Sequence, residues 1–152
     1  MKLKDGELRL AKTSDADAIA TMSRLTIEQG LRWRWRPARV RQAIADLDTN
    51  AIVITQDGLL TGFSIAWFGQ NEAHLILLGV HPSCRRRGTG AHLVKWQEKV
   101  AETAGIRTLT LEVRESNEIA REFYYQLGFR ENRLLKQYYD GSEDALRMVH
   151  HL

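Results

Sequence analysis

Residues 85–91 combine three arginines with two glycines, a composition suited to holding an anion. An apolar, strand-like run ends at Val80, and apolar residues at helical spacing follow Gly90, so the segment joins a strand to the start of a helix. The first N–H groups of a helix have no helical partner, and they lie at the positive end of its dipole. Glycine lets the backbone approach a ligand closely, and arginine adds charge-assisted hydrogen bonds. The pattern predicts a polyphosphate site. Its residues are Arg85, Arg86, Arg87, Gly88, Thr89, Gly90 and Ala91.

Two common phosphate-binding motifs do not fit this loop. A P-loop needs Gly-Lys followed by Ser or Thr, which the loop lacks. The dinucleotide fingerprint needs a third small residue, and Leu93 stands there. A solvated basic patch or a nucleic-acid contact remain as alternatives. The formal net charge of +3 is low for a protein that binds nucleic acid over its whole surface, and it disfavours that class.

Composition indicates one globular domain over residues 1–152. Hydrophobic residues make up 43% of the chain and charged residues 27%, so neither disorder nor a membrane protein is indicated. No apolar run reaches the roughly 20 residues that span a bilayer, and the start of the chain does not resemble a signal peptide. The single cysteine, Cys84, fits a reducing compartment. We therefore expect a cytoplasmic protein. We expect no metal site, because His74, His81 and His92 lack ligand spacing.

Periodicity and turn signals predict the element order β-α-α-β-β-β-α-β-α-β-β. Helix one is expected to carry Ile19, Met22 and Leu25, and in helix two Val40, Ile44 and Leu47 are expected to share a face. Three consecutive antiparallel strands are expected between helices two and three. Strands are expected over 7–11, 51–55, 59–68, 72–80, 108–113, 129–139 and 145–150, and helices over 14–29, 37–48, 90–104 and 117–127.

The chain from Glu7 to His150 resembles the GCN5-related N-acetyltransferase (GNAT) family. The resemblance lies in the Arg85-x-x-Gly88-x-Gly90 motif after Val80-x-Pro82, in Leu111-Glu112-Val113, and in the stretch from Phe123 to Phe129. It implies an α/β (α+β) fold with a mixed central sheet of about seven strands flanked by four helices. It also implies acetyl-CoA as co-substrate and direct transfer of acetyl to a primary amine.

The resemblance places the coenzyme in a V where the fourth and fifth strands separate. The pantetheine arm would pair with Leu78, Gly79 and Val80, with Gly79 as a β-bulge. The backbone N–H of Val80 would polarise the thioester carbonyl. Asn117 matches a position that contacts the pantetheine arm, although Asn is also a good helix N-cap.

Two side chains match the acid and base positions of the family. Tyr124, with a hydroxyl pKa of about 10, would protonate the leaving thiolate, whose thiol pKa is about 8.5. Glu112 would remove a proton from the amine through a water molecule. Each also has a simpler interpretation, since Glu112 fits the exposed face of an alternating strand and Tyr124 fits core packing.

The acceptor is the least defined part of the prediction. The C-terminal half resembles the ribosomal-protein-alanine N-acetyltransferases, which implies that Tyr138 and Tyr139 contact a substrate N-terminus. The segment Trp33, Arg34, Trp35 departs from that pattern. It could recruit a carboxylate-bearing acceptor, or it could be two packed tryptophans with arginines in solvent. Both a small amine and a protein N-terminus remain open as acceptors.

Two other functions fit parts of the sequence. A non-catalytic acyl-CoA-binding module would use the same anion loop. An RNA-binding protein would use the Trp/Arg stretch 32–36, because arginine and aromatic rings suit single strands. The sequence also leaves open whether the last two strands pair within one chain or across a homodimer.

Overall fold

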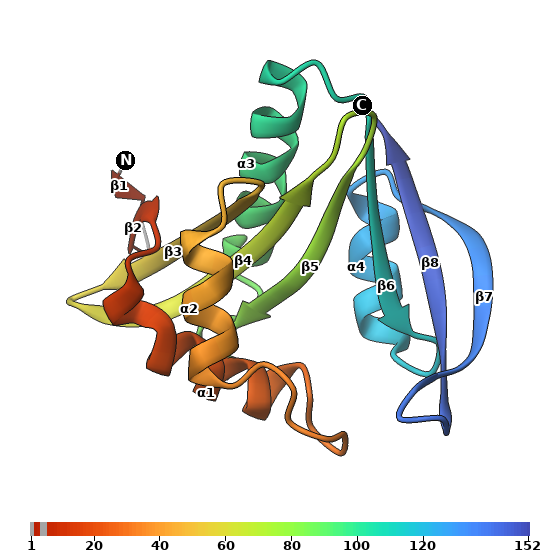
Figure 1. Cartoon of the computed structure of the whole chain (residues 1–152), viewed down its shortest axis with the longest axis horizontal. Helices are drawn as coiled ribbons and strands as arrows, with labels where there is room; N and C mark the ends of the chain where they lie inside the picture. The colour runs from red at the N-terminus through yellow and green to blue at the C-terminus, as the bar shows by residue number, and fades with distance from the viewer. Residues whose placement is uncertain (1, 4–5) are drawn as a thin grey trace.

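A computed structural model describes residues 2–3 and 6–152 of the chain, and Figure 1 shows its elements. No helix in this described part is long and apolar enough to cross a membrane. The strands are β1 (Lys2–Leu3), β2 (Gly6–Leu10), β3 (Thr49–Gln56), β4 (Leu59–Phe68), β5 (Ala73–Val80), β6 (Thr108–Arg114), β7 (Arg130–Tyr139) and β8 (Glu143–His151). The helices are α1 (Ala16–Thr26), α2 (Pro37–Ala45), α3 (Thr89–Thr103) and α4 (Glu118–Gln126), with 3₁₀ turns at Thr13–Asp15 and Pro82–Cys84.

The predicted fold and order of elements are confirmed, with β1 as a short additional strand at the edge of the sheet. Both α1 and α2 end earlier than predicted, at Thr26 and Ala45. The predicted place of Leu47 on the apolar face of the second helix was wrong, because Leu47 lies beyond the end of α2 and is fully exposed, whereas Leu25 lies in α1 as expected but is 64% exposed. Their apolar faces are therefore shorter than the sequence pattern indicates.

All strands belong to one sheet of order β1-β2-β3-β4-β5-β6-β8-β7. Every neighbouring pair is antiparallel except β5 and β6, which are parallel. β7 pairs with β8 of the same chain, and β8 inserts between β6 and β7. The last two strands are therefore a hairpin within one molecule.

β5 and β6 separate soon after they begin. Only three residue pairs join them, the last being Leu75 with Leu111. Beyond that rung the two strands diverge, which opens the V between the halves of the sheet in Figure 1. The predicted separation of the fourth and fifth strands, here β5 and β6, is thus present.

A β-bulge lies at the point of separation, but at Ile76 and not at Gly79. Ile65 pairs with Leu77 and Ala66 with Leu75, so Ile76 is the extra residue of β5. The bulge reverses the side-chain alternation: Leu75 packs in one core cluster and Leu77 in another. Gly79 pairs in register with Phe63, so the prediction of a bulge there was wrong.

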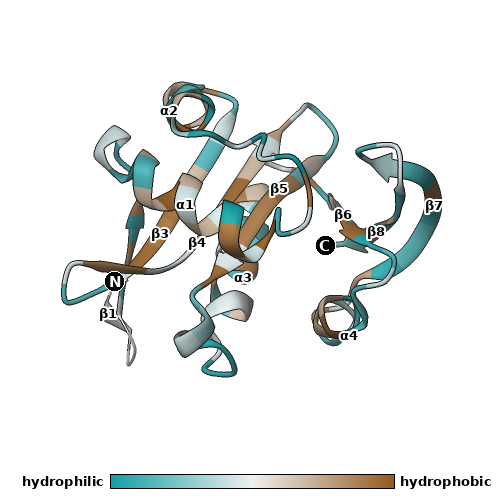
Figure 2. Ribbon diagram, turned by 90° about the horizontal axis from the view of Figure 1, so that it is seen from below, coloured by the Kyte–Doolittle hydropathy of each residue, from teal (hydrophilic) through white to brown (hydrophobic). Residues whose placement is uncertain are grey.

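Helices cover both faces of the sheet. α1 and α2 pack on one face of β3, β4 and β5, while α3 packs on the opposite face. α4 packs on the same side as α3, against β6 and β8, in a cluster around the fully buried Phe129. Figure 2 shows the apolar strands between these two helical layers. The V between β5 and β6 therefore has α1 and α2 on one side of the sheet and α3 and α4 on the other.

Candidate active site

A cleft of about 710 Å³ occupies the V. Its floor is formed by β5 and β6, one wall by the α1–α2 loop and α2, and the other by α4 and the β7–β8 hairpin. Among the predicted site residues, those lining the cleft are Arg34, Trp35, Leu78, Glu112, Asn117, Tyr124, Tyr138 and Tyr139. Arg32, Arg39, His74, Arg114 and Asp140 also line it.

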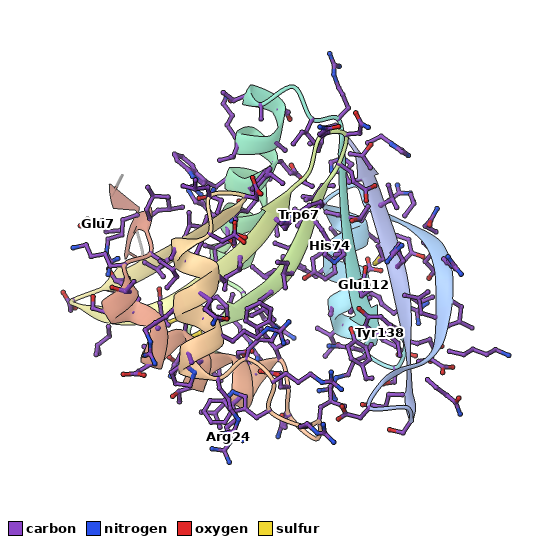
Figure 3. The ribbon with its side chains drawn as sticks, in the orientation of Figure 1. Glu7, Arg24, Trp67, His74, Glu112 and Tyr138 are labelled. Carbon is purple, nitrogen blue, oxygen red and sulfur yellow. The ribbon has the colours of Figure 1, made fainter. Side chains whose placement is uncertain are left out.

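Strand register brings a carboxylate and three donors together on the floor of the cleft. His74 pairs with Thr110 across β5 and β6, so its side chain lies on the same face as that of Glu112, two residues farther along β6. Arg147 is the partner of Glu112 on β8. Tyr138 reaches in from β7, and Figure 3 shows it beside Glu112 and His74.

Both oxygens of Glu112 accept hydrogen bonds. Oε1 lies 3.1 Å from His74 Nε2 and 3.1 Å from the Tyr138 hydroxyl, and Oε2 lies 3.2 Å from Arg147 Nε. Burial by itself would raise the pKa of the Glu112 carboxyl, but the hydrogen bond and charge of His74, with Arg147 and Tyr138, lower it overall. Glu112 is therefore an oriented, ionised carboxylate facing the cleft, and the simple surface interpretation does not describe it.

Tyr124 lies on α4 and lines the wall of the same cleft. Its ring packs edge to face against Phe123 and Phe129, with centroids 5.0 and 5.5 Å away. Burial, and then the nearby Tyr139, raise the pKa of the Tyr124 hydroxyl. Its hydroxyl forms no hydrogen bond with any residue that the structure describes. Packing fixes the ring, and the phenol keeps its proton available for a ligand.

The loop between β5 and α3 presents unpaired backbone donors. Gly88 precedes the first residue of α3 in the left-handed conformation, with φ of 82°, and Arg86 also has a positive φ of 63°. In the described part of the chain, no N–H from Arg85 to Ala91 donates to a backbone carbonyl or a side chain. The three arginine side chains are exposed beside them. These groups match the requirements of a bound polyphosphate.

Close packing explains the second glycine of the loop. A Cβ at Gly90 would lie 3.2 Å from the Phe123 ring, tighter than an ordinary contact, so glycine favours the close approach of the start of α3 to α4. This contact places the loop beside the helix that carries Tyr124. An anion held by the loop would therefore lie at the α3–α4 side of the V.

The free edge of β5 leads from this loop into the cleft. The N–H of His81 donates to Thr61 on β4 at 2.8 Å. Because successive N–H groups of a strand point to opposite sides, the N–H groups of Val80 and Leu78 point toward the V. Gly79, between them, is required by packing: a Cβ there would lie 2.5 Å from Phe63.

Asn117 lies at the start of α4 and acts as its N-cap. Its side-chain oxygen accepts a hydrogen bond from the N–H of Ala120 at 3.1 Å. The capping interpretation of Asn117 therefore holds, and the residue also lines the cleft.

Trp33 does not face the cleft, in contrast to the predicted substrate-binding role. Its Nε1 donates to the carbonyl of Ala20 at 3.2 Å, and its ring packs against the α1–α2 core. Arg24 and Arg36 stack on it, 5.0 and 4.8 Å from the ring centroid. The packing interpretation holds for Trp33, whereas its neighbours Arg34 and Trp35 line the cleft.

Two carboxylates that the sequence analysis did not single out hold the α1–α2 loop in place. Glu28, 7% exposed, accepts hydrogen bonds from the N–H groups of Arg34 and Trp35 and from the Ser23 hydroxyl. Asp140 accepts from the N–H of Arg32 at 2.7 Å and from Arg34 Nη2 at 3.0 Å.

His74 and Arg114 were also missed as residues of the cleft. Arg114 donates to the carbonyls of Ile27 and Gln29 and so links β6 to the α1–α2 loop. The alternation of β5 and β6 could have placed His74 near Glu112. The partners of Asp140 and Arg114 had no such signal, because they lie 85 residues or more away along the chain.

The separated strands, the donor-rich loop, and a carboxylate and a phenol in one cleft define the class of acyl-CoA-dependent N-acyltransferases. The acetyltransferase (GNAT) family model matches residues 19–129, and the chain belongs to this family.

Named relatives are similar over much of the chain. An uncharacterized N-acetyltransferase of Methanocaldococcus jannaschii is 38% identical over 94 residues, which cover 61% of this chain and only 60% of that protein. The ribosomal protein bS18-alanine N-acetyltransferase of Escherichia coli (strain K12) is 39% identical over 99 residues, covering 63% of this chain and 67% of that protein. The crystal structure of the Escherichia coli ribosomal-protein-S18-alanine N-acetyltransferase has a TM-score of 0.84 at 28% identity, covering 96% of this chain and 93% of that one.

Proposed function

We propose that this protein transfers the acetyl group of acetyl-CoA directly to a primary amine. The observation that carries the proposal is the position of Glu112 on the floor and Tyr124 on a wall of one cleft, which the unpaired edge of β5 connects to the anion loop. The coenzyme, when bound, supplies the acetyl thioester. Residues 85–91 would hold its phosphates, and the free edge of β5 would hold its arm.

Three groups of the chain would carry out the transfer. The N–H of Val80 would donate to the thioester oxygen as negative charge develops there. Glu112 would accept the proton of the amine through a water molecule. An α-amine, with a pKa near 8, requires little help, whereas a lysine near 10.4 requires more. The Tyr124 hydroxyl would then donate its proton to the departing thiolate sulfur.

The structure offers less support for the two alternatives. A non-catalytic CoA-binding module needs no ionised carboxylate facing a phenol across the cleft. An RNA-binding surface needs aromatic rings free for base stacking, but Trp33 stacks with Arg24 and Arg36, and Trp35 stacks with Arg39. The acceptor is an amine of a small molecule or of a protein N-terminus.

The proposal is tested by Tyr124→Phe in a thiol-release assay with acetyl-CoA and a panel of amines. We expect kcat to fall about 100-fold, the lower range for loss of a general acid, with CoA affinity unchanged in calorimetry. Tyr125→Phe is the matched control, since Tyr125 is the next residue of α4 and does not line the cleft. It should change kcat less than about twofold. Absence of thiol release from wild type with every amine, despite CoA binding, would favour the binding module.

A further inference from the structure

The wall of the cleft formed by the α1–α2 loop and α2, here called the acceptor wall, carries two guanidinium groups that form no ion pair with a carboxylate. Arg32 and Arg39 both line the cleft. Neither forms an ion pair within the described residues, whereas Arg34 pairs with Asp140 and Arg114 with Glu143. Arginine remains charged at any physiological pH. The wall therefore carries two positive charges that form no direct ion pair with the described residues.

The carboxylates of the same cleft are already engaged. Glu28 accepts from two backbone N–H groups and a hydroxyl. Asp140 accepts from the backbone of Arg32 and the side chain of Arg34. Glu112 accepts from His74, Tyr138 and Arg147. The charges of Arg32 and Arg39 thus remain for a ligand to neutralise.

Stacking orients one of these guanidiniums in advance. The guanidinium carbon of Arg39 lies 4.0 Å from the centroid of the Trp35 ring. A stacked guanidinium keeps its in-plane N–H groups free, and these match the two oxygens of a carboxylate. The Trp35 backbone is in turn held by Glu28. Little side-chain entropy remains to be lost when Arg39 binds a ligand.

We propose that the acceptor is an amine that also carries a carboxylate, which Arg39 and Arg32 bind while the amine faces Glu112. This inference rests on the proposed acetyltransfer. The cleft is then complementary to a ligand with both groups, since its floor carries the oriented carboxylate of Glu112 and the wall formed by the α1–α2 loop and α2 carries the two guanidiniums. The carboxylate can come from a small amino acid or from an acidic residue near a peptide N-terminus.

Matched acceptors test this proposal and distinguish the two sources. The peptide arm compares Ala-Asp with Ala-Asn at the start of otherwise identical peptides with amidated C-termini. The small-molecule arm compares glutamate with glutamine amide, in which both carboxyl groups are neutral amides. We expect the acidic member of at least one pair to have a kcat/KM about 10-fold or more above its neutral partner, as a charge-assisted hydrogen bond implies.

Variants of the two arginines test whether Arg39 and Arg32 cause the preference for acidic acceptors. Arg39→Gln and Arg32→Gln should each raise KM for the acidic acceptor about 10-fold, with less than twofold change for the neutral one and none for acetyl-CoA. Arg41→Gln is the matched control, because Arg41 lies on the same helix, faces Asp17 and does not line the cleft. It should leave both KM values unchanged.

The outcomes separate this inference from the proposed activity. Equal kcat/KM for acidic and neutral acceptors, or an equal effect of Arg39→Gln on both, would overturn the carboxylate preference and leave acetyltransfer intact. If no acceptor releases thiol, the carboxylate preference is tested by calorimetry, which measures how tightly each peptide binds to the CoA-saturated protein. Acidic peptides binding no more tightly than neutral ones would then refute the preference, whereas tighter binding reversed by Arg39→Gln would support it without catalysis.

Discussion

At the scale of single residues, the surroundings of Glu112 determine how pH acts on it. The pKa of this carboxyl is lowered, because the donors around it outweigh the effect of burial. A carboxyl with a lowered folded pKa stabilises the fold above its unfolded pKa of about 4.3, and this contribution is lost as the pH falls through the folded value. Glu112 is therefore an anion throughout the neutral range.

This charge state predicts the pH dependence of the reaction. We expect any loss of kcat/KM between about pH 8 and pH 5 to come from protonation of the amine acceptor or of another group, not from Glu112. Glu112→Gln should lower kcat but leave that acid limb at the same pH. The measurement is the pH profile of kcat/KM for both proteins with one acceptor. Disappearance of the limb in the variant would show that Glu112 titrates there.

The sequence could predict part of the candidate site. Motif spacing and the family resemblance pointed to Glu112, Tyr124 and the loop 85–91, and the structure places Glu112 and Tyr124 in one cleft. The role of Glu28 could not be predicted, because a lone glutamate in the last turn of a predicted helix resembles an exposed one. Its burial depends on the N–H groups of Arg34 and Trp35, which turn back onto it.

At the scale of elements, β5 combines two features that its apolar sequence does not distinguish. Strand formation follows from its β-branched and leucine residues. The bulge at Ile76 has no such signal, since the residues from Leu75 to Leu78 are all large and apolar. The glycine at 79 suggested a bulge by type, but its actual requirement is the close approach of the Phe63 ring.

That contact gives a stability prediction for β5. Gly79→Ala would place a Cβ 2.5 Å from Cε1 of the fully buried Phe63. We expect the free energy of unfolding to fall by about 1–3 kcal/mol, the usual effect of overpacking, as measured by urea denaturation. Gly79→Ala combined with Phe63→Leu should cost less than the sum of the two single changes, because the smaller side chain removes the clash. Strict additivity would contradict this explanation.

At the scale of the whole molecule, contacts across the V join the two halves of the sheet. Arg114 and Asp140 on the β6–β8 side hold the α1–α2 loop on the other side. Hydrogen bonds from the Arg32 backbone and the Arg34 side chain lower the pKa of the Asp140 carboxyl. The link is therefore present at neutral pH and weakens only as the pH falls below the usual aspartate value of about 3.9.

Removing this link should loosen the acceptor wall. Asp140→Gly eliminates both hydrogen bonds and tolerates the positive φ of 51° at this position. We expect faster amide hydrogen exchange over residues 30–36 and a higher acceptor KM, with little change in CoA affinity. Asp57→Gly is the matched control, since Asp57 has φ of 52° in the β3–β4 turn, and it should leave exchange over 30–36 unchanged. Unchanged exchange in Asp140→Gly would show that Glu28 and Arg114 hold the loop without Asp140.

The single extra residue at Ile76 also constrains how the length of this chain can vary. Before it, Ala73 and Leu75 pack in the cluster that contains α3 residues, and after it Leu77 packs in the cluster that contains α1 residues, so the odd-numbered side chains of β5 change face at this one position. An insertion or deletion inside β5 would move residues from one core into the other. A length change in the 69–72 turn would leave both cores intact. Among homologous chains, gaps should therefore gather in that turn and be absent from 73–80.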